Sequence, residues 1–465
     1  MCCNDKKSMK KVFEKLNKAH SQYYQVFNRE KKLIELLETI VNERDTIKKA
    51  IQSDFKKPFA EIDFTEIVPV VSELRHAISN INKWTKPQKN SRTLVHYNSK
   101  VRVIYQPKGV VLIISPWNYP FSLCIGPLIS AIAAGNRVII KPSEFTPNTS
   151  AYIKELLSKV FPDDWVYVAT GGADVAKELT SLPFNHIFFT GSPNVGKLVM
   201  KAASEHLCSV TLELGGKSPC ILDENFNAQT FAKRVVWGKF INAGQTCIAP
   251  DYLLIPKNRR NECLEFLEKE INERFPGPVD SYTRIINEKH FNRLIEVLED
   301  AKSKGAIIHY GGESDTNELY IKPTIISNIT SNMTIHNEEI FGPILPVYTY
   351  ETKEDCIRDI LSKPRPLATY LFTKDKSTMN LYKDNINTGA LVVNDVLSHY
   401  IHKHLPFGGS NNSGIGRSHG IYGFKAFSNE MAYLETGPGP TGADIIKQPY
   451  DNKVKFLIDK AIKYL

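Results

Sequence analysis

The chain has 465 residues, of which 42% are hydrophobic and 23% are charged, a balance typical of a globular protein with a large core. It has no uninterrupted apolar run of about 18 residues, so the sequence predicts no membrane-spanning helix. The formal net charge of +9 is a mild excess for this length and gives no indication of nucleic-acid binding.

Residues 8–80 are predicted to form helices, because apolar side chains recur at helical spacing, for example from Leu33 to Ile40. Residues 93–109 (TLVHYNSKVRVIYQPKG) then alternate between apolar and polar side chains. This pattern predicts a two-stranded hairpin with the letters NSK at its turn.

From residue 110 onward, short β-like runs alternate with helical stretches. Strands are predicted at residues 110–115, 137–143, 165–171, 186–191 and 209–216. A second alternation extends over about residues 216–400. Strands that alternate with crossover helices form a parallel sheet covered by helices on both faces. The sequence therefore predicts an α/β protein with two such units.

A candidate nucleotide site occurs in HIFFTGSPNVGK, where a strand, a turn from Gly191 to Gly196 and a helix start follow one another. Backbone N–H groups at such a helix N-terminus suit a pyrophosphate. The turn is neither the GxGxxG fingerprint nor a Walker loop, so an ordinary strand-to-helix turn is the alternative. Lys141 and Glu144 follow another strand end and either reach ribose hydroxyls or are solvated loop charges.

Three further residues suggest acyl chemistry. Cys247 ends the polar turn NAGQTC, which offers the backbone freedom and hydrogen bonds that a reactive thiol needs, although most cysteines are inert. Glu213 lies among apolar residues in VTLELGG, where burial would raise its pKa toward that of a useful base, unless it faces solvent. Asn118 lies between prolines in SPWNYPF, and its fixed amide suits an oxyanion hole or simply belongs to a turn.

The other cysteines are dispersed without CxxC pairs. This argues against a structural zinc site and a disulfide scaffold and fits a reducing, cytoplasmic setting. We therefore expect no metal.

Seven motifs occur in the order SPWNYPF, KPSE, FFTGSPNVGK, LELGGKSP, NAGQTC, EEIFGPILPV and PFGGSNNSGIGR. Together they resemble the aldehyde dehydrogenase superfamily over about residues 90–436. The short N-terminus and the letters GQTCIAPDY are most similar to its class 3 (family 3) branch, which contains dehydrogenases for aromatic, medium-chain and fatty aldehydes.

The resemblance implies roles for individual residues. Cys247 matches the nucleophile, Glu213 the general base, and Asn118 the amide that holds the oxyanion together with the Cys247 backbone N–H. NAD, or alternatively NADP, would contact Lys141, Glu144, Gly191, Ser192, Gly196, Glu339 and Phe341. Two aromatic residues, Tyr119 and Trp237, are expected in an apolar substrate tunnel, with core packing as the alternative for Trp237.

The implied reaction oxidises an aldehyde to the carboxylic acid through a cysteine thiohemiacetal and a thioester. One alternative is an acylating enzyme that passes the thioester to coenzyme A, against which Glu213 argues because it serves the water step. The other is a non-catalytic protein of the same fold, against which the presence of Cys247, Glu213 and Asn118 argues.

The resemblance also implies a parallel Rossmann-like coenzyme domain, a second α/β catalytic domain and a small β arm for oligomerisation. The coenzyme domain comprises residues 1–91 and 109–212, and the catalytic domain comprises residues 213–412. The arm comprises residues 92–108 and 427–440. The hairpin and the strand near NEMAYLE look like edge elements that need a partner, so we expect a homodimer.

The C-terminal tail, residues 441–465, contains an amphipathic helical pattern with a basic face. Its apolar face comprises Val454, Leu457, Ile458, Ala461, Ile462 and Leu465. This face either packs on the protein's own body or on the dimer mate, or it lies on an anionic membrane surface as a peripheral contact.

Overall fold

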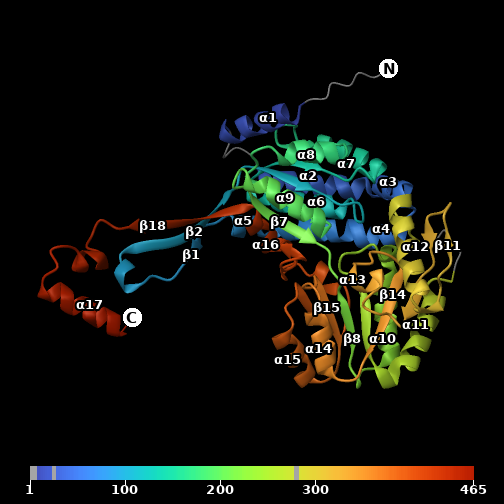
Figure 1. Ribbon diagram of the computed structural model, residues 1–465. Coiled ribbons are helices and arrows are strands. Elements are labelled where there is room, and N and C mark those ends of the chain that lie inside the picture. The colour runs from blue at the N-terminus through green and yellow to red at the C-terminus, as the bar shows by residue number, and fades with distance from the viewer. Residues whose placement is uncertain (1–7, 23–27, 277–281, 465) are drawn as a thin grey trace, which may run out of the picture.

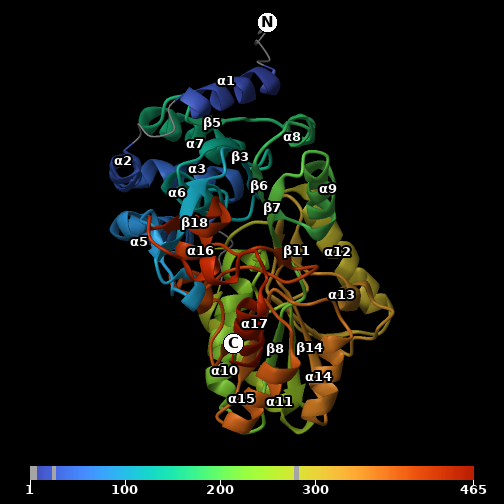
Figure 2. The same cartoon turned by 90° about the vertical axis from the view of Figure 1, so that its left-hand side faces the viewer.

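Two α/β units lie one above the other, and an arm of strands projects from the side of the molecule (Figure 1). The structure is a computed structural model that describes residues 8–22, 28–276 and 282–464. The turned view shows the same stacking and looks along the arm, with α17 (Asn452–Tyr464) in front (Figure 2). None of the helices in these described ranges is long and apolar enough to cross a membrane.

The N-terminal segment is helical, as predicted. Its elements are α1 (Met9–Gln22), α2 (Arg29–Asn42), α3 (Arg44–Phe55), α4 (Phe59–Ile62), the π-helical turn η1 (Asp63–Ile67) and α5 (Val68–Trp84). Leu33, Leu36 and Ile40 on α2 are fully buried, which confirms the helical spacing of the apolar residues.

The first unit is built on a six-stranded sheet with the order β17-β7-β6-β3-β4-β5. Five strands are parallel, namely β3 (Val110–Ile114), β4 (Arg137–Lys141), β5 (Val166–Val168), β6 (His186–Gly191) and β7 (Ser209–Leu214). The short β17 (Gly414–Ile415) returns antiparallel beside β7. The helices that follow these strands are α6 (Ser122–Ala134), α7 (Pro147–Val160), α8 (Ala173–Thr180) and α9 (Pro193–Ser204).

Both faces of this sheet are covered, because successive side chains of a strand point to opposite sides. On β3, Val111 and Ile113 pack in the core formed with α2, α5, α6 and α7. Val110 and Leu112 pack instead in the core formed with α1, α8 and α9. This explains why β3 is apolar throughout rather than alternating.

The second unit contains a seven-stranded sheet with the order β10-β13-β14-β9-β8-β15-β16. Its strands are β8 (Pro219–Leu222), β9 (Tyr252–Pro256), β10 (Ile307–Tyr310), β13 (Thr324–Ser327), β14 (Ile344–Tyr350), β15 (Ala368–Phe372) and β16 (Ala390–Val393). All pairs are parallel except β10 with β13. The predicted α/β class with two parallel sheets is therefore confirmed.

The helices of the second unit are α10 (Ala228–Phe240), α11 (Arg260–Arg274), α12 (Glu288–Ser303), α13 (Thr334–Asn337), α14 (Lys353–Leu361) and α15 (Lys376–Asn385). A small ladder joins β11 (Ser314–Asp315) to β12 (Tyr320–Ile321). Single 3-10 turns are η3 (Ile241–Gly244), η4 (Lys257–Arg259) and η6 (Ser398–Ile401). The chain then returns to the first unit through α16 (Gly420–Ala426).

The arm is a three-stranded sheet with the order β1-β2-β18, and its strands are β1 (Gln88–Lys89), β2 (Ser99–Pro107) and β18 (Ser428–Thr436). The predicted hairpin within residues 93–109 is wrong. Leu94–His96 form the 3-10 turn η2, and Ser99 and Lys100 of the predicted NSK turn already belong to β2. The reason is that β18 pairs with all nine residues of β2. Residues 93–109 therefore contain one long strand, and its partner comes from a distant part of the chain.

The tail leaves the arm through η7 (Gly442–Ile446) and ends in α17. Figure 1 places α17 at the tip of the arm, apart from the body of the same chain. The option that its apolar face packs on that body is therefore wrong for the described residues. Leu465, which the prediction placed on this face, lies outside them.

Candidate active site

Cys247 lies where three cavities meet. One is a cleft of about 580 Å³, the second an apolar cavity of about 170 Å³, and the third a chamber of about 50 Å³. The thiol follows η3, in which Asn242 and Ala243 have left-handed backbone angles, with φ of +55° and +52°. Non-glycine residues adopt such angles at a cost, so this turn is held in place by its surroundings.

The 580 Å³ cleft is large enough for a coenzyme-sized ligand. Gly191 ends β6, and Ser192 caps the N-terminus of α9, where its Oγ accepts a hydrogen bond from Val195 N at 3.4 Å. A Cβ on Gly196 would lie 2.7 Å from Leu214 Cδ2, so this glycine allows α9 to pack closely against β7. The helix N-terminus faces the cleft and suits a pyrophosphate.

Lys141 is the last residue of β4 and forms an ion pair with Glu144 in the loop that follows, with Lys141 Nζ 2.5 Å from Glu144 Oε2. Lys141 is buried, whereas the Glu144 side chain is 35% exposed. Neither residue is among those that line the large cleft. The pair lies on the same carboxyl edge of the sheet as Gly191, which is where parallel sheets bind nucleotides.

Glu339 reaches the cleft from the loop that precedes β14. Its carboxylate packs on Gly215, because a Cβ there would lie 2.0 Å from Glu339 Oε2. Burial raises the pKa of Glu339 to about 8, and the nearby Asp251 carboxylate adds to the shift. Phe341 follows in a left-handed conformation, and its ring centroid lies 5.4 Å from that of Trp117.

The Cys247 thiol is held neutral in this structure. Burial, together with the nearby carboxyl groups of Glu339 and Glu213, raises its pKa to about 12, because a thiolate here would lack water and lie beside other acidic groups. In the described part of the chain Cys247 forms no disulfide.

Glu213 is the last but one residue of β7 and is only 6% exposed. Burial raises its pKa to about 8, which confirms the shift predicted from its apolar neighbours. Ser418 Oγ donates a hydrogen bond to Glu213 Oε1 at 2.9 Å, and Oε2 has no hydrogen-bond partner among the residues that the structure describes. The free oxygen and the raised pKa leave this carboxyl able to take a proton.

Asn118 is 3% exposed and contributes to the wall of the large cleft, together with Cys247. Its Nδ2 donates to the carbonyl oxygen of Gln245 at 3.0 Å, two residues before the cysteine. One N–H of the amide is thus used to fix the side chain, and the second remains for a ligand.

Tyr119 and Trp237 line the apolar cavity on the other side of Cys247. The Tyr119 hydroxyl lies 2.6 Å from Thr246 Oγ1, so its polar end is satisfied and its ring faces the cavity. Trp237 packs edge-on against Phe64, with 6.0 Å between ring centroids.

The structure thus brings most of the predicted site residues together around Cys247, with Lys141, Glu144 and Gly196 set further back. Sequence reasoning missed Ser418, which holds Glu213, and Gln245, which holds Asn118. Gln245 lies inside the NAGQTC motif, and its place two residues before Cys247 could have indicated a role at the site. Ser418 lies one residue past the last motif, and nothing in the sequence around it indicates its contact with Glu213.

A family model described as "Aldehyde dehydrogenase family" matches residues 3–432. The chain belongs to the aldehyde dehydrogenase family. The resemblance found in the seven motifs is therefore confirmed, and the protein is an NAD(P)-dependent oxidoreductase that converts an aldehyde to the carboxylic acid.

Relatives of this aldehyde dehydrogenase include the 4,4'-diaponeurosporen-aldehyde dehydrogenase of Staphylococcus aureus, which is 40% identical over 92% of the chain and 93% of the relative. Aldehyde dehydrogenase family 3 member A2 of Pongo abelii is 37% identical over 91% and 87%. The structure described as the substrate-bound state of Staphylococcus aureus AldH superposes with a TM-score of 0.93 at 38% identity, covering 97% of this chain and 99% of that one.

Proposed function

We propose that this aldehyde dehydrogenase oxidises aromatic or medium- to long-chain aliphatic aldehydes through a covalent intermediate on Cys247. The observation that carries the proposal is the position of this thiol between a large cleft and an aromatic cavity. The cleft would hold the dinucleotide and the cavity the hydrocarbon part of the aldehyde. Similar proteins include one named as a probable coniferyl aldehyde dehydrogenase of Pseudomonas aeruginosa.

In the proposed mechanism, the Cys247 thiol releases its proton to solvent as Sγ attacks the aldehyde carbon, which forms a thiohemiacetal with a negatively charged oxygen. The Asn118 amide and the Cys247 backbone N–H stabilise the oxyanion, each by about 3 kcal/mol. A bound coenzyme would supply the hydride acceptor, and loss of hydride from the thiohemiacetal carbon would leave a thioester on Cys247. Glu213 then takes a proton from water, and the resulting hydroxide hydrolyses the thioester to the carboxylic acid.

We propose that the coenzyme is bound by the N-terminus of α9 with Gly191, Ser192 and Gly196, by Lys141 and Glu144 at the ribose of the adenosine half, and by Glu339 and Phe341 at the nicotinamide half. The fit is supported by the size of the cleft and by Gly191, Ser192, Glu339 and Phe341, which line it.

Chain length of the aldehyde should determine the specificity constant. Each buried CH₂ contributes about 0.8 kcal/mol, so kcat/KM for hexanal and benzaldehyde should exceed that for acetaldehyde by about tenfold or more. Trp237→Ala should lower kcat/KM for hexanal and leave acetaldehyde, the internal control, nearly unchanged. NADH formation with a panel of aldehydes measures both. A preference for acetaldehyde would contradict the proposed substrate class.

NAD should be preferred over NADP. The Glu144 carboxylate would repel a 2′-phosphate, and like charges about 4 Å apart in water repel by ~1 kcal/mol, which corresponds to about fivefold in kcat/KM. Its ion pair with Lys141 moderates this repulsion. Steady-state kinetics with both coenzymes test the preference, and Glu144→Gln should reduce it. Equal kcat/KM values in the unchanged enzyme would show that Glu144 does not face the ribose.

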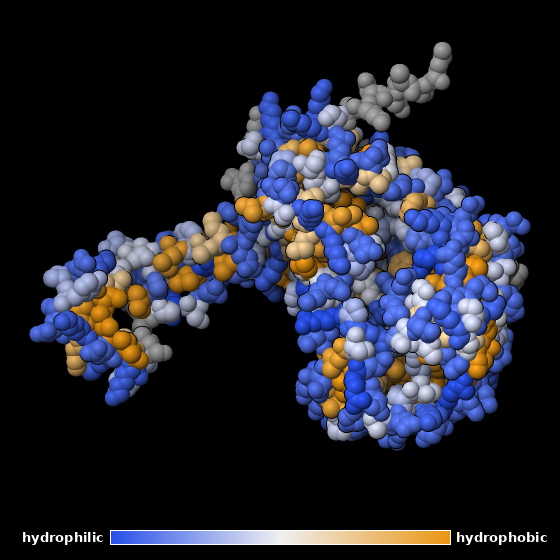
Figure 3. Space-filling view, viewed as in Figure 1, coloured by the Kyte–Doolittle hydropathy of each residue, from blue (hydrophilic) through white to orange (hydrophobic). Residues whose placement is uncertain are grey.

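We propose that the arm forms the dimer interface of a cytoplasmic enzyme. In the described part of the chain β18 pairs only with β2, so its outer edge carries unpaired backbone groups. Apolar residues gather along the arm and at its tip in the space-filling view (Figure 3). Leu434 on β18 and Phe456 and Ile462 on α17 are 53%, 57% and 79% exposed. An exposed apolar patch of this kind fits a partner subunit or a membrane surface.

Truncation of the tail distinguishes a partner subunit from a membrane surface in one experiment. A chain that ends at Tyr450 lacks α17 but keeps the strands of the arm, so light scattering should give a dimer mass for both chains. If the basic amphipathic helix binds membranes peripherally, only the full chain should sediment with anionic vesicles, and high salt should weaken its binding. A dimer mass that drops to that of a monomer on truncation would instead assign α17 to the dimer mate.

A further inference from the structure

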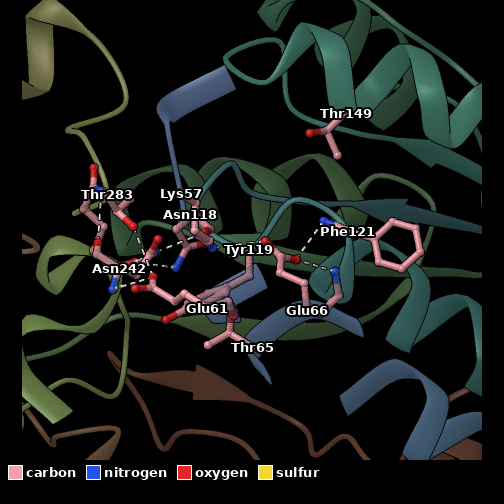
Figure 4. Close-up of polar contacts among 12 residues, drawn as sticks. Lys57, Glu61, Thr65, Glu66, Asn118, Tyr119, Phe121, Thr149, Asn242 and Thr283 are labelled. Carbon is pink, nitrogen blue, oxygen red and sulfur yellow. Dashed lines mark hydrogen bonds and ion pairs between the residues drawn. The ribbon is translucent and has the colours of Figure 1, made fainter. Parts of the chain in front are cut away.

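A buried ion pair lies directly behind the loop that carries Asn118 (Figure 4). Lys57 and Glu66 are both completely buried, and Lys57 Nζ lies 3.1 Å from Glu66 Oε1. Removing two charges from water costs more than their attraction returns unless further hydrogen bonds satisfy both groups. The further contacts of this pair therefore indicate what it does.

Lys57 contacts the loop at its first residue. Its Nζ donates to the backbone carbonyl of Asn118 at 3.2 Å. The same ammonium group lies 4.2 Å from the ring centroid of Tyr119, which is cation–π distance.

Glu66 contacts the loop at its other end. Its Oε2 accepts hydrogen bonds from the backbone N–H groups of Phe121 at 3.1 Å and of Ser122 at 2.9 Å, where α6 begins. The ion pair thus holds the short segment Asn118–Pro120 from both sides. Glu66 reaches this position from the π-helical turn η1, a rare element that occurs frequently at functional sites.

The contacts continue to the turn that presents Cys247. The Asn118 carbonyl oxygen also accepts from Asn242 Nδ2 at 3.0 Å, and Asn242 has the strained left-handed backbone described above. The Gln245 carbonyl oxygen accepts from both Asn118 Nδ2 and Asn242 Nδ2, each at 3.0 Å. The loop of the oxyanion amide and the turn of the nucleophile are therefore connected through the carbonyl group that Lys57 binds.

We propose that Lys57 and Glu66 are positioning residues that fix the Asn118 amide relative to Cys247 for stabilisation of the oxyanion. Neither residue lines the cleft, so both act through the backbone of the loop. The inference rests on the proposed role of Asn118.

A double-mutant cycle tests the proposal. Lys57→Met combined with Glu66→Gln removes both charges at once and keeps an acceptor for the two N–H groups. A displacement of about 1 Å can cost about 10²-fold in rate, so the NADH burst rate should fall by roughly 10- to 100-fold. The Kd for NAD and the KM for the aldehyde should change little. Asp63→Asn, in the same π-helical turn but paired with Arg44 at the surface, is the matched control and should leave the burst rate unchanged.

The decisive comparison is made in the Asn118→Ala background. If the ion pair acts through the Asn118 amide, its removal there should cost less than about threefold, because the two effects are not additive. An equal loss in both backgrounds would show a merely structural pair and overturn the inference. Full activity of Asn118→Ala alone would overturn the role of Asn118 itself and, with it, the inference. If the charge-free pair does not fold, Glu66→Gln alone, which breaks one of the two contacts, enters the same cycle with the same criterion.

Discussion

Replacement of Cys247 by serine should abolish aldehyde oxidation and leave coenzyme binding nearly unchanged. A serine hydroxyl is a far weaker nucleophile than a thiol unless an adjacent base activates it. Loss of a catalytic nucleophile costs about 10⁴-fold or more in kcat. NADH formation measures the activity, and coenzyme binding is measured by titration of the variant with NAD.

The matched control for this variant is Cys208→Ser. Cys208 is also a partly buried free cysteine, but it lies before β7 and lines none of the three cavities around Cys247. Its replacement should leave kcat unchanged. Normal turnover by Cys247→Ser would disprove the assignment of the nucleophile.

Glu213→Gln should separate the two halves of the reaction. Glutamine keeps an oxygen for the hydrogen bond from Ser418 but takes no proton, so acylation should proceed and hydrolysis should slow by about 10²- to 10⁴-fold. Rapid mixing with NAD and an aldehyde should therefore show one burst of NADH followed by a stall. If the burst itself disappears, Glu213 acts earlier, on the thiol.

The pH dependence of hydrolysis follows from the same residue. Burial raises the pKa of Glu213 to about 8, so at neutral pH the larger fraction of this carboxyl is protonated and inactive as a base. The hydrolysis rate should rise with pH in proportion to the ionised fraction and level off above about 8. In Glu213→Gln this rise should be lost. The pH profile of the steady-state rate under conditions where hydrolysis is limiting provides the measurement.

The α/β class was predictable because alternating strands and helices leave a strong local pattern. The arm was not. Residues of β2 alternate like one strand of a hairpin, but their long partner is β18, which is distant in sequence. Local periodicity shows that a strand exists but does not show which segment pairs with it. The prediction therefore paired this strand with a neighbouring segment inside residues 93–109 instead of with β18.

The candidate site was predictable to the extent that its residues lie in motifs. The sequence does contain a signal for Glu66. At helical spacing it falls on the same face as Val70 and Leu74, which are buried. A carboxylate on an apolar face needs a partner. Lys57 left no such signal, since it resembles its neighbour Lys56, which is exposed and pairs with Glu318 at the surface. Only the folded chain distinguishes these two lysines.

The neutral thiol of Cys247 has a consequence for the lifetime of the enzyme. Peroxide and alkylating reagents attack the thiolate form of cysteine, and susceptibility to oxidation follows thiolate character. With the pKa of Cys247 raised to about 12 by burial and by two carboxylates, almost none of this form exists in the structure described here. The same burial that keeps the proposed nucleophile protonated should therefore also slow its oxidation and alkylation while the site is empty.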